Sequence, residues 1–157
     1  MADASVKVST TTQITHIGSG TSLASGGTIN PSSDVSTALS FTGNLNRYPR
    51  ADAALMLTAT ASIASTSTAI YLYRRDLNID STNDETVPGA SNKNKFMGAF
   101  VVQAATTVST THYCQITDVA LPGAGDCEFY IENALGVNIP AGWTLKITPK
   151  TDVGATA

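Results

Sequence analysis

The stretch WTLKIT, residues 143–148, has the clearest structural pattern in the chain. Its three large apolar side chains, beginning with Trp143, alternate with threonine and lysine. Successive side chains of a β-strand point to opposite faces, so this two-residue period predicts a strand with one face, including Trp143, in a core. Lys146 on the polar face and Pro149 directly after the stretch discourage further strand pairing, which predicts a protected sheet edge.

Weaker segments of the same period recur outward from this strand. They lie at residues 55–58, 70–73, 96–102, 113–121 and 128–132, with Gly or Pro turns between several of them. No stretch keeps a helical period over about ten residues, so any helix should be a single short turn. The 157 residues suit one domain. Together these features predict an all-β fold, either an antiparallel β-sandwich or a jelly roll.

Residues 1–50 differ from the rest because they are rich in Ser, Thr and Gly and poor in large apolar side chains. Such a segment buries too little surface to hold itself in place. We therefore divide the chain into a weakly patterned lead-in, residues 1–50, and a sandwich domain, residues 51–157. The lead-in is either a flexible tail or an extended N-terminal arm. We favour the arm, in which residues 1–30 order against a neighbouring subunit as an added strand.

Charge, apolar run length and the first residues argue against several classes of partner and location. Charged residues make up 13% of the chain, about half the usual share, and the formal net charge is −3. No basic stripe marks a nucleic-acid surface, no apolar run is long enough to span a bilayer, and the first residues carry no secretion signal. We therefore expect a protein that is made in a cytoplasm, binds neither nucleic acid nor membrane, and packs against protein partners.

The sequence offers no catalytic constellation. It contains no Gly-x-Ser-x-Gly elbow, no phosphate-binding Gly-x-x-x-x-Gly-Lys and no His-Glu-x-x-His zinc motif. The two histidines, His16 and His112, are interpreted as ordinary surface or core residues. Two cysteines with one nearby histidine are too few ligands for a structural zinc site. We therefore predict that the protein is not an enzyme and needs no cofactor or metal.

Cys114 and Cys127 lie on apparent strands on either side of a turn at residues 122–126. If those strands form a simple hairpin, the two cysteines lie roughly 20 Å apart, at about 3.3 Å per residue. A disulfide needs Cα atoms within about 7 Å. The sequence thus predicts two buried free thiols.

The strongest polar cluster is RRDLNIDSTNDE, residues 74–85. Its Asp-x-Asn-x-Asp spacing, from Asp76 to Asp80, resembles the opening of an EF-hand calcium loop. However, Ser81 stands where that loop needs Gly, and Val87 stands where it needs Glu. This departure favours a solvated or interface loop over a calcium site.

Arg74 and Arg75 are adjacent strand residues, so they point to opposite faces and only one of them can face a given partner. The loop after them, residues 76–94, is long for a sandwich connection, and long loops are usually functional or disordered. We expect part of this loop to contact a neighbouring subunit, with one arginine pairing a carboxylate there.

Carboxylates and tyrosines in the second half of the chain leave a carbohydrate function open. Glu128 and Glu132 share a strand face and could form the acid pair of a glycosidase, although a polar outer face explains them as well. Tyr71, Tyr73 and Tyr130 could form a sugar-binding platform. They could equally lie between two subunits, where tyrosine is enriched.

The second half of the chain resembles the decoration, or cement, proteins of tailed-bacteriophage capsids. The resemblance lies in four stretches: YLYRRDLNID (71–80), KFMGAF (95–100), GDCEFYIEN (125–133) and PAGWTLKITPKT (140–151). It implies a small β-sandwich or jelly-roll subunit, usually a homotrimer, on the outside of the virion head. Such a subunit clamps adjacent major capsid protein subunits, commonly with an extended N-terminal arm, and needs no cofactor.

Two alternatives stay open beside this decoration function. One is another virion part, such as a tail, fibre or head–tail adaptor protein, and the other is a carbohydrate-binding β-sandwich module. For the decoration function, the expected subunit or capsid interface comprises Val6, Val8, Ile14, Ile17, Arg74, Arg75, Asp76 and Asp80.

Overall fold

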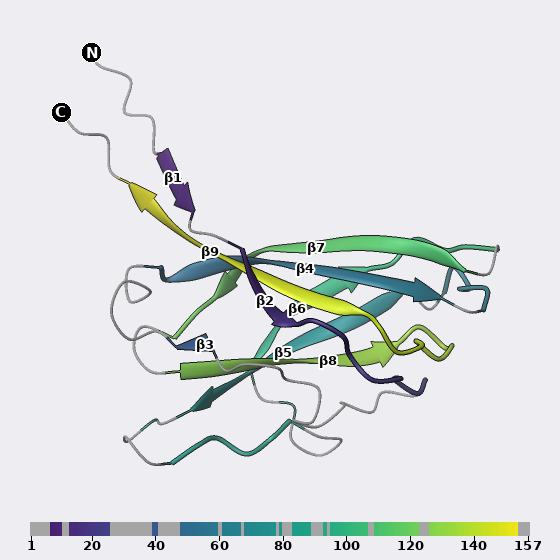
Figure 1. Cartoon of the computed structure of the whole chain (residues 1–157), viewed down its shortest axis with the longest axis horizontal. Coiled ribbons are helices and arrows are strands. Elements are labelled where there is room, and N and C mark those ends of the chain that lie inside the picture. Colours follow the sequence, from purple (N-terminus) through teal and green to yellow (C-terminus); the bar gives the residue numbers. More distant parts are fainter. Residues whose placement is uncertain are drawn as a thin grey trace.

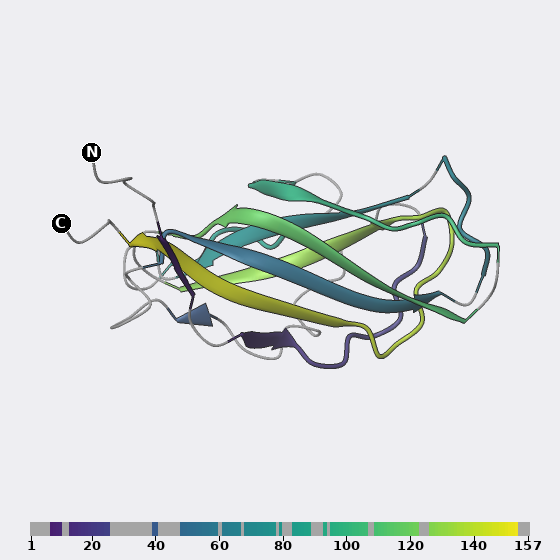
Figure 2. The same cartoon turned by 90° about the horizontal axis from the view of Figure 1, so that it is seen from above.

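The computed structural model is an all-β molecule in which two antiparallel sheets pack face to face (Figure 1 and Figure 2). It describes residues 7–10, 13–25, 39–40, 48–59, 61–66, 68–77, 79, 83–88, 93, 95–106, 109–122 and 126–153. For residues 7–10, 39–40 and 152–153 it describes the backbone alone. No helix occurs among these residues. The predicted all-β antiparallel sandwich is confirmed.

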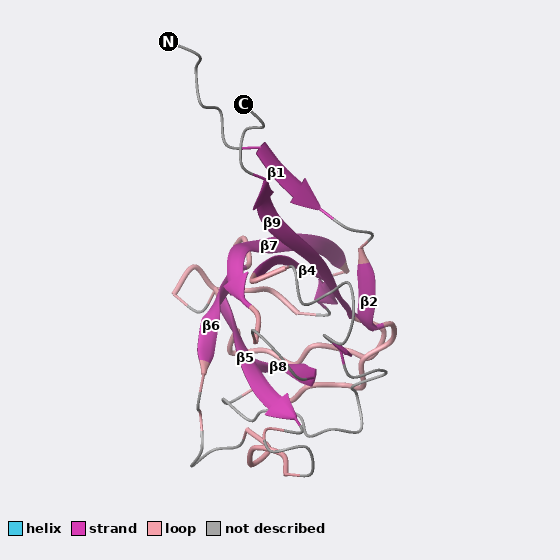
Figure 3. Ribbon diagram, turned by 90° about the vertical axis from the view of Figure 1, so that its left-hand side faces the viewer, coloured by secondary structure: helices cyan, strands magenta, loops and turns pink. Residues whose placement is uncertain are grey.

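Strands that follow one another in the chain mostly lie in different sheets. One sheet has the order β1-β9-β4-β7, and β2 pairs with β9 along the same edge as β1. The other sheet has the order β3-β8-β5-β6. Figure 3 shows the two layers from one end. The strands are β1 (Lys7–Thr10), β2 (Ile14–Ile17), β3 (Leu39–Ser40), β4 (Arg50–Ala59), β5 (Ala69–Leu77), β6 (Phe96–Val101), β7 (Thr110–Ala120), β8 (Asp126–Ala134) and β9 (Thr144–Val153).

The stretch with the clearest sequence pattern forms the start of β9 and the residue before it. Trp143, Leu145 and Ile147 are at most 2% exposed, as the two-residue period predicts. The predicted sheet edge is wrong, because β9 lies between β4 and the pair β1 and β2. Pro149 lies inside the strand, opposite Ala51 of β4 and level with the gap between β1 and β2. On that side no described strand pairs with it, so a residue without an N–H is tolerated.

Residues 13–25 are part of the sandwich, in contrast to the expected lead-in arm. β2 pairs with β9, and Ile17 and Leu23 are each 2% exposed in the main core. Leu23 and Ile139 exchange two backbone hydrogen bonds, each 2.9 Å long. Three large apolar side chains, Ile14, Ile17 and Leu23, are too few to form a visible period. Hydrogen bonds to β9 and to Ile139 hold residues 13–25 in place. These partners are distant in the chain, so the local sequence pattern does not predict them.

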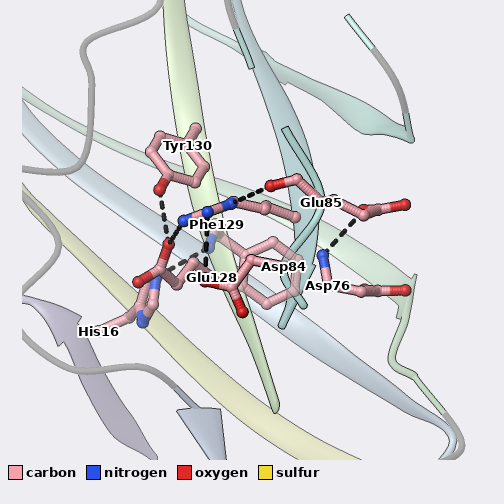
Figure 4. Close-up of polar contacts among 8 residues, drawn as sticks. His16, Asp76, Asp84, Glu85, Glu128, Phe129 and Tyr130 are labelled. Atoms are coloured by element: carbon pink, nitrogen blue, oxygen red, sulfur yellow. Dashed lines mark hydrogen bonds and ion pairs between the residues drawn. The ribbon is translucent and has the colours of Figure 1, made fainter. Parts of the chain in front are cut away.

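His16 joins the two sheets at this side of the sandwich. It is fully buried in β2, and its Nε2 accepts a hydrogen bond of 2.9 Å from the Phe129 N–H of β8 (Figure 4). β3 pairs with β8 only at residues 126–127. The Phe129 N–H lies beyond the end of that pairing, and the imidazole accepts its hydrogen bond in place of a strand carbonyl. The imidazole also meets the Phe129 ring edge-on, with ring centroids 5.8 Å apart. His16 is therefore a core histidine with a structural hydrogen bond.

The strands on either side of residues 122–126 do not form the expected hairpin. β7 pairs with β4 in the first sheet, whereas β8 lies between β3 and β5 in the second. The connection therefore crosses between sheets, which the turn residues alone could not reveal. Cys114 and Cys127 are nevertheless buried and free, so the predicted thiols are confirmed. Burial raises the pKa of both thiols.

Candidate interaction surfaces

A ladder of cross-strand pairs covers the outer face of the sheet that contains β5 and β8. Tyr71 lies opposite Glu132, Tyr73 opposite Tyr130, and Arg75 opposite Glu128. The loop between β5 and β6 packs on this ladder through Val87. Tyr73 is 5% exposed and Tyr130 is 2% exposed, although both lie outside the main core. We call Tyr73, Arg75, Glu128, Tyr130 and Glu132 the covered cluster.

Each carboxylate of the covered cluster accepts from a tyrosine and pairs with a cation. Tyr73 Oη donates to Glu132 at 2.8 Å, and Lys93 Nζ lies 2.5 Å from the same carboxylate. Tyr130 Oη donates to Glu128 at 2.6 Å (Figure 4), and Arg75 lies 3.2 Å from Glu128.

Burial next to these carboxylates favours the neutral phenols over the charged phenolates. It raises the pKa of Tyr130 to about 12 and raises the pKa of Tyr73 as well. The cluster is therefore electrostatically satisfied within the chain.

This arrangement leaves two of the three named tyrosines unavailable to a sugar, and the carbohydrate alternatives stay a prediction. Glu128 and Glu132 share a face, as predicted, but Glu132 is 2% exposed and both carboxylates are ion-paired. Tyr73 and Tyr130 lie under the loop, so they offer no flat ring face to a sugar. A sugar platform needs exposed rings, and only Tyr71 of the three is partly exposed.

Arg74 and Arg75 do point to opposite sides of β5. The Arg75 Nε donates to the Glu85 carbonyl at 2.7 Å on the outer face, and Arg75 also pairs with Asp84 at 3.3 Å. Arg74 Nη1 instead reaches the other sheet and donates to the Ala120 carbonyl at 2.5 Å. Both guanidinium groups thus have partners in their own chain, and the expected contact with a neighbouring subunit stays a prediction.

Asp76 of β5 ties together the two ends of the β5–β6 loop. Its carboxylate lies 2.7 Å from Arg74 Nε and 2.5 Å from Lys95 Nζ. Its N–H donates to the Glu85 carboxylate at 2.9 Å (Figure 4). Asp80 lies outside the described residues, and so does Asn78 of the Asp-x-Asn-x-Asp spacing that resembles a calcium loop.

The four interface candidates near the N-terminus divide into three groups. Val6 lies outside the described residues. Val8 lies in β1 opposite Asp152 of the same chain, and Ile14 is partly buried opposite Ile147. Ile17 is in the core, so it cannot face a partner. Its apolar character, taken from the sequence as an interface signal, reflects burial within the fold.

Sequence reasoning missed a surface at the side of the sandwich where β6 and β7 lie. These strands end the two sheets (Figure 3), and they carry Phe96, Val101 and Tyr113, which are 54%, 73% and 79% exposed. A cleft of about 480 Å³ lies between Val101, residues 103–106 and residues 110–114. We call these two strands and the cleft the open side. The lack of charge from residue 96 to residue 117 was the available signal.

No protein-family model, curated protein or solved structure matches the chain. Within the described ranges, no helix is long and apolar enough to cross a membrane. In the same part of the chain, no group of three or more His, Cys, Asp or Glu side chains could hold a metal ion. The fold and the surfaces define a β-sandwich with a covered polar cluster on one sheet and an open side at β6 and β7.

Proposed function

We propose that this protein is a non-enzymatic virion structural protein, a decoration subunit that binds the outer surface of a phage head. In this function it clamps adjacent major capsid protein subunits and is synthesised in the host cytoplasm. The observation that carries the proposal is the open side. Three of the large apolar side chains exposed in the described chain, Phe96, Val101 and Tyr113, lie there. Val101 and Tyr113 line one cleft there, whereas Phe96 packs beside Tyr71 and Tyr73. Exposed apolar groups that lie together in this way mark a protein–protein contact.

The order of the strands supports a finer assignment of the fold as a jelly roll. Counted from β2 to β9, the chain alternates between sheets except for the β5–β6 hairpin. The result is two facing four-strand sets, β2-β9-β4-β7 and β3-β8-β5-β6. Two interlocked Greek keys give this order, and the jelly roll they form is common in viral capsid proteins. Lectin domains share the architecture, so the fold by itself does not decide the function.

The resemblance to decoration proteins adds to this support. Its four stretches coincide with β5, β6, β8 and β9 and their flanks. Three of these strands are consecutive members of one sheet, and β6 forms part of the open side. A tail, fibre or adaptor protein is the competing assignment. Copy number separates them, because a decoration subunit approaches the copy number of the major capsid protein.

The experiment adds the purified full chain to undecorated capsid shells and measures occupancy by co-sedimentation. Saturable binding near the copy number of the capsid protein is expected, and light scattering of the free protein tests the expected homotrimer. A Phe96→Asp/Val101→Asp variant should bind at least tenfold more weakly. Thr15→Asp, an exposed change on β2 outside the open side, is the matched control. Absence of binding by the parent protein would overturn the proposal.

A further inference from the structure

The sheet edges of this sandwich are protected unequally. Proteins shield edge strands by keeping them short, bulged or charged, because unpaired N–H and C=O groups recruit other strands. β1 and β2 have four residues each, and β3 has two. β6 has six, and its pairing with β5 is interrupted next to Gly98. β7 has eleven residues, and no other described strand pairs with its outer edge.

β7 itself divides into a protected half and an unprotected half. After Ile116 its pairing with β4 shifts register, and Asp118 adopts a left-handed φ of 60°. Asp118 also pairs with Arg50 at 2.9 Å and with Lys150 at 3.0 Å. Residues 110–116 pair with β4 without interruption and contain no Asp, Glu, Lys or Arg. This half is a regular, uncharged edge that is open to a further strand.

Space for the side chains of an added strand exists beside this edge. The cleft of the open side borders residues 110–114. A smaller hollow of about 210 Å³ also borders Tyr113, but it extends away from the edge over β4 and β9, to Met56 and Thr144. Strand addition combines main-chain hydrogen bonds with recesses for alternate side chains, and β7 offers both.

We propose that residues 110–116 of β7 pair antiparallel with the same residues of a second copy, about a two-fold axis normal to the sheet. The edge is self-complementary in chemistry. Antiparallel self-pairing brings together Thr, Tyr and Gln side chains without opposing like charges, and Thr–Thr and aromatic pairs stabilise such contacts. Thr58 and Thr111 already make a hydroxyl contact of 3.1 Å across β4 and β7, so the second copy continues an existing row.

The two-fold axis also bears on an exposed side chain of the other sheet. An axis normal to the first sheet joins the two five-stranded sheets into one and leaves both second sheets on the same side. The β6 edges of the two copies then approach each other, and Val101, which lines the cleft beside β7, lies near the contact. The pairing does not depend on the proposed capsid function. It gives a dimer, or a hexamer where the expected trimer also forms.

The test uses the full chain with single cysteines on the outer face of β7. Thr111→Cys, Tyr113→Cys and Gln115→Cys are oxidised alone and as mixtures of two variants. In any antiparallel register that places two of these positions opposite each other, one sample then brings two cysteines within disulfide distance. After mild oxidation, at least one variant should run mainly as a covalent dimer without reductant. Thr15→Cys should stay uncrosslinked, as should the parent, whose Cys114 and Cys127 are buried.

A second measurement follows the mass in solution. Thr111→Lys/Gln115→Lys places like charges across the two-fold axis and should halve the light-scattering mass, whereas Thr15→Lys should leave it unchanged. Absence of crosslinks in every variant, or a mass that the double-lysine variant does not change, overturns the proposal. If the free protein is always monomeric but the double-lysine variant loses shell binding, the edge binds a foreign strand instead, and self-pairing is wrong.

Discussion

Gly20 lies directly against the indole ring of Trp143. A Cβ atom added at Gly20 would lie 1.9 Å from Trp143 Cε2. Two hydrogen bonds fix this contact. The Gly20 N–H donates to the Trp143 carbonyl at 2.8 Å, and Trp143 Nε1 donates to the Thr21 carbonyl at 2.7 Å. Residues 20–21 therefore cover the side chain of Trp143, which lies directly before β9. Glycine is required at position 20 for space.

Gly20→Ala should destabilise the fold by about 1–3 kcal/mol or more, since the added methyl overlaps a buried ring. Gly18→Ala is the matched control, because its Cβ would meet Thr15 at an ordinary 3.5 Å. Urea unfolding monitored by tryptophan fluorescence measures both. Equal midpoints for the two variants would show that the segment does not close on Trp143.

Trp143→Ala should cost about 3–5 kcal/mol, the usual range for emptying a large core site. Trp143 is 2% exposed, and its loss also leaves the Thr21 carbonyl without the indole donor. Trp143→Phe should cost less, because it keeps part of the ring volume. Thermal unfolding checks the order, and an alanine variant that melts within a degree or two of the parent would contradict it.

Two N-terminal truncations separate an arm from a core segment. A chain that begins at Gln13 loses β1 and should still unfold cooperatively. A chain that begins at Asn30 also loses Ile17, Leu23 and the His16 hydrogen bond, so it should fail to unfold as a single cooperative unit. Circular dichroism and differential scanning calorimetry distinguish the two. Cooperative unfolding of the shorter chain near the parent's temperature would restore the arm hypothesis for residues 13–25.

Arg75→Glu should destabilise the protein by roughly 3 kcal/mol, because it breaks a largely buried ion pair and places two carboxylates together. The loss should appear first as faster proteolysis of the β5–β6 loop, which Arg75 holds through the Glu85 carbonyl. The double variant Arg75→Glu/Glu128→Arg should recover part of the loss. Lys146→Glu, on the outer face of the other sheet, is the charge-matched control, and an equal effect there would refute the specific pairing.

Stability should fall as the pH rises from about 10 to about 12. The pKa of Tyr130 is about 12 in the folded chain, and a free tyrosine titrates near 10. Between these values the folded state holds the proton that the unfolded state releases, so the stability present below about pH 10 is progressively lost. Tyr130→Phe should flatten this dependence in urea unfolding.

How far sequence reasoning reached can be judged from particular residues. The alternation around Leu145 and Ile147 identified a strand and its buried face, because side-chain direction follows from backbone geometry alone. The same rule placed Arg74 and Arg75 on opposite sides and Glu128 and Glu132 on one side. It failed at Tyr73 and Tyr130, which alternate like outer-face residues but are buried under a loop.

The sequence by itself determined the all-β class and the core face of β9, because each depends on local periodicity. The two free thiols were predicted correctly, but from a hairpin that the fold does not contain. Only the tertiary structure decided that β7 and β8 belong to different sheets and that residues 13–25 close over Trp143. It also decided that β7 ends a sheet with an uncharged edge. These features depend on which distant strands pair, and pairing is set by the total burial and hydrogen bonding of the whole chain, which no local pattern contains.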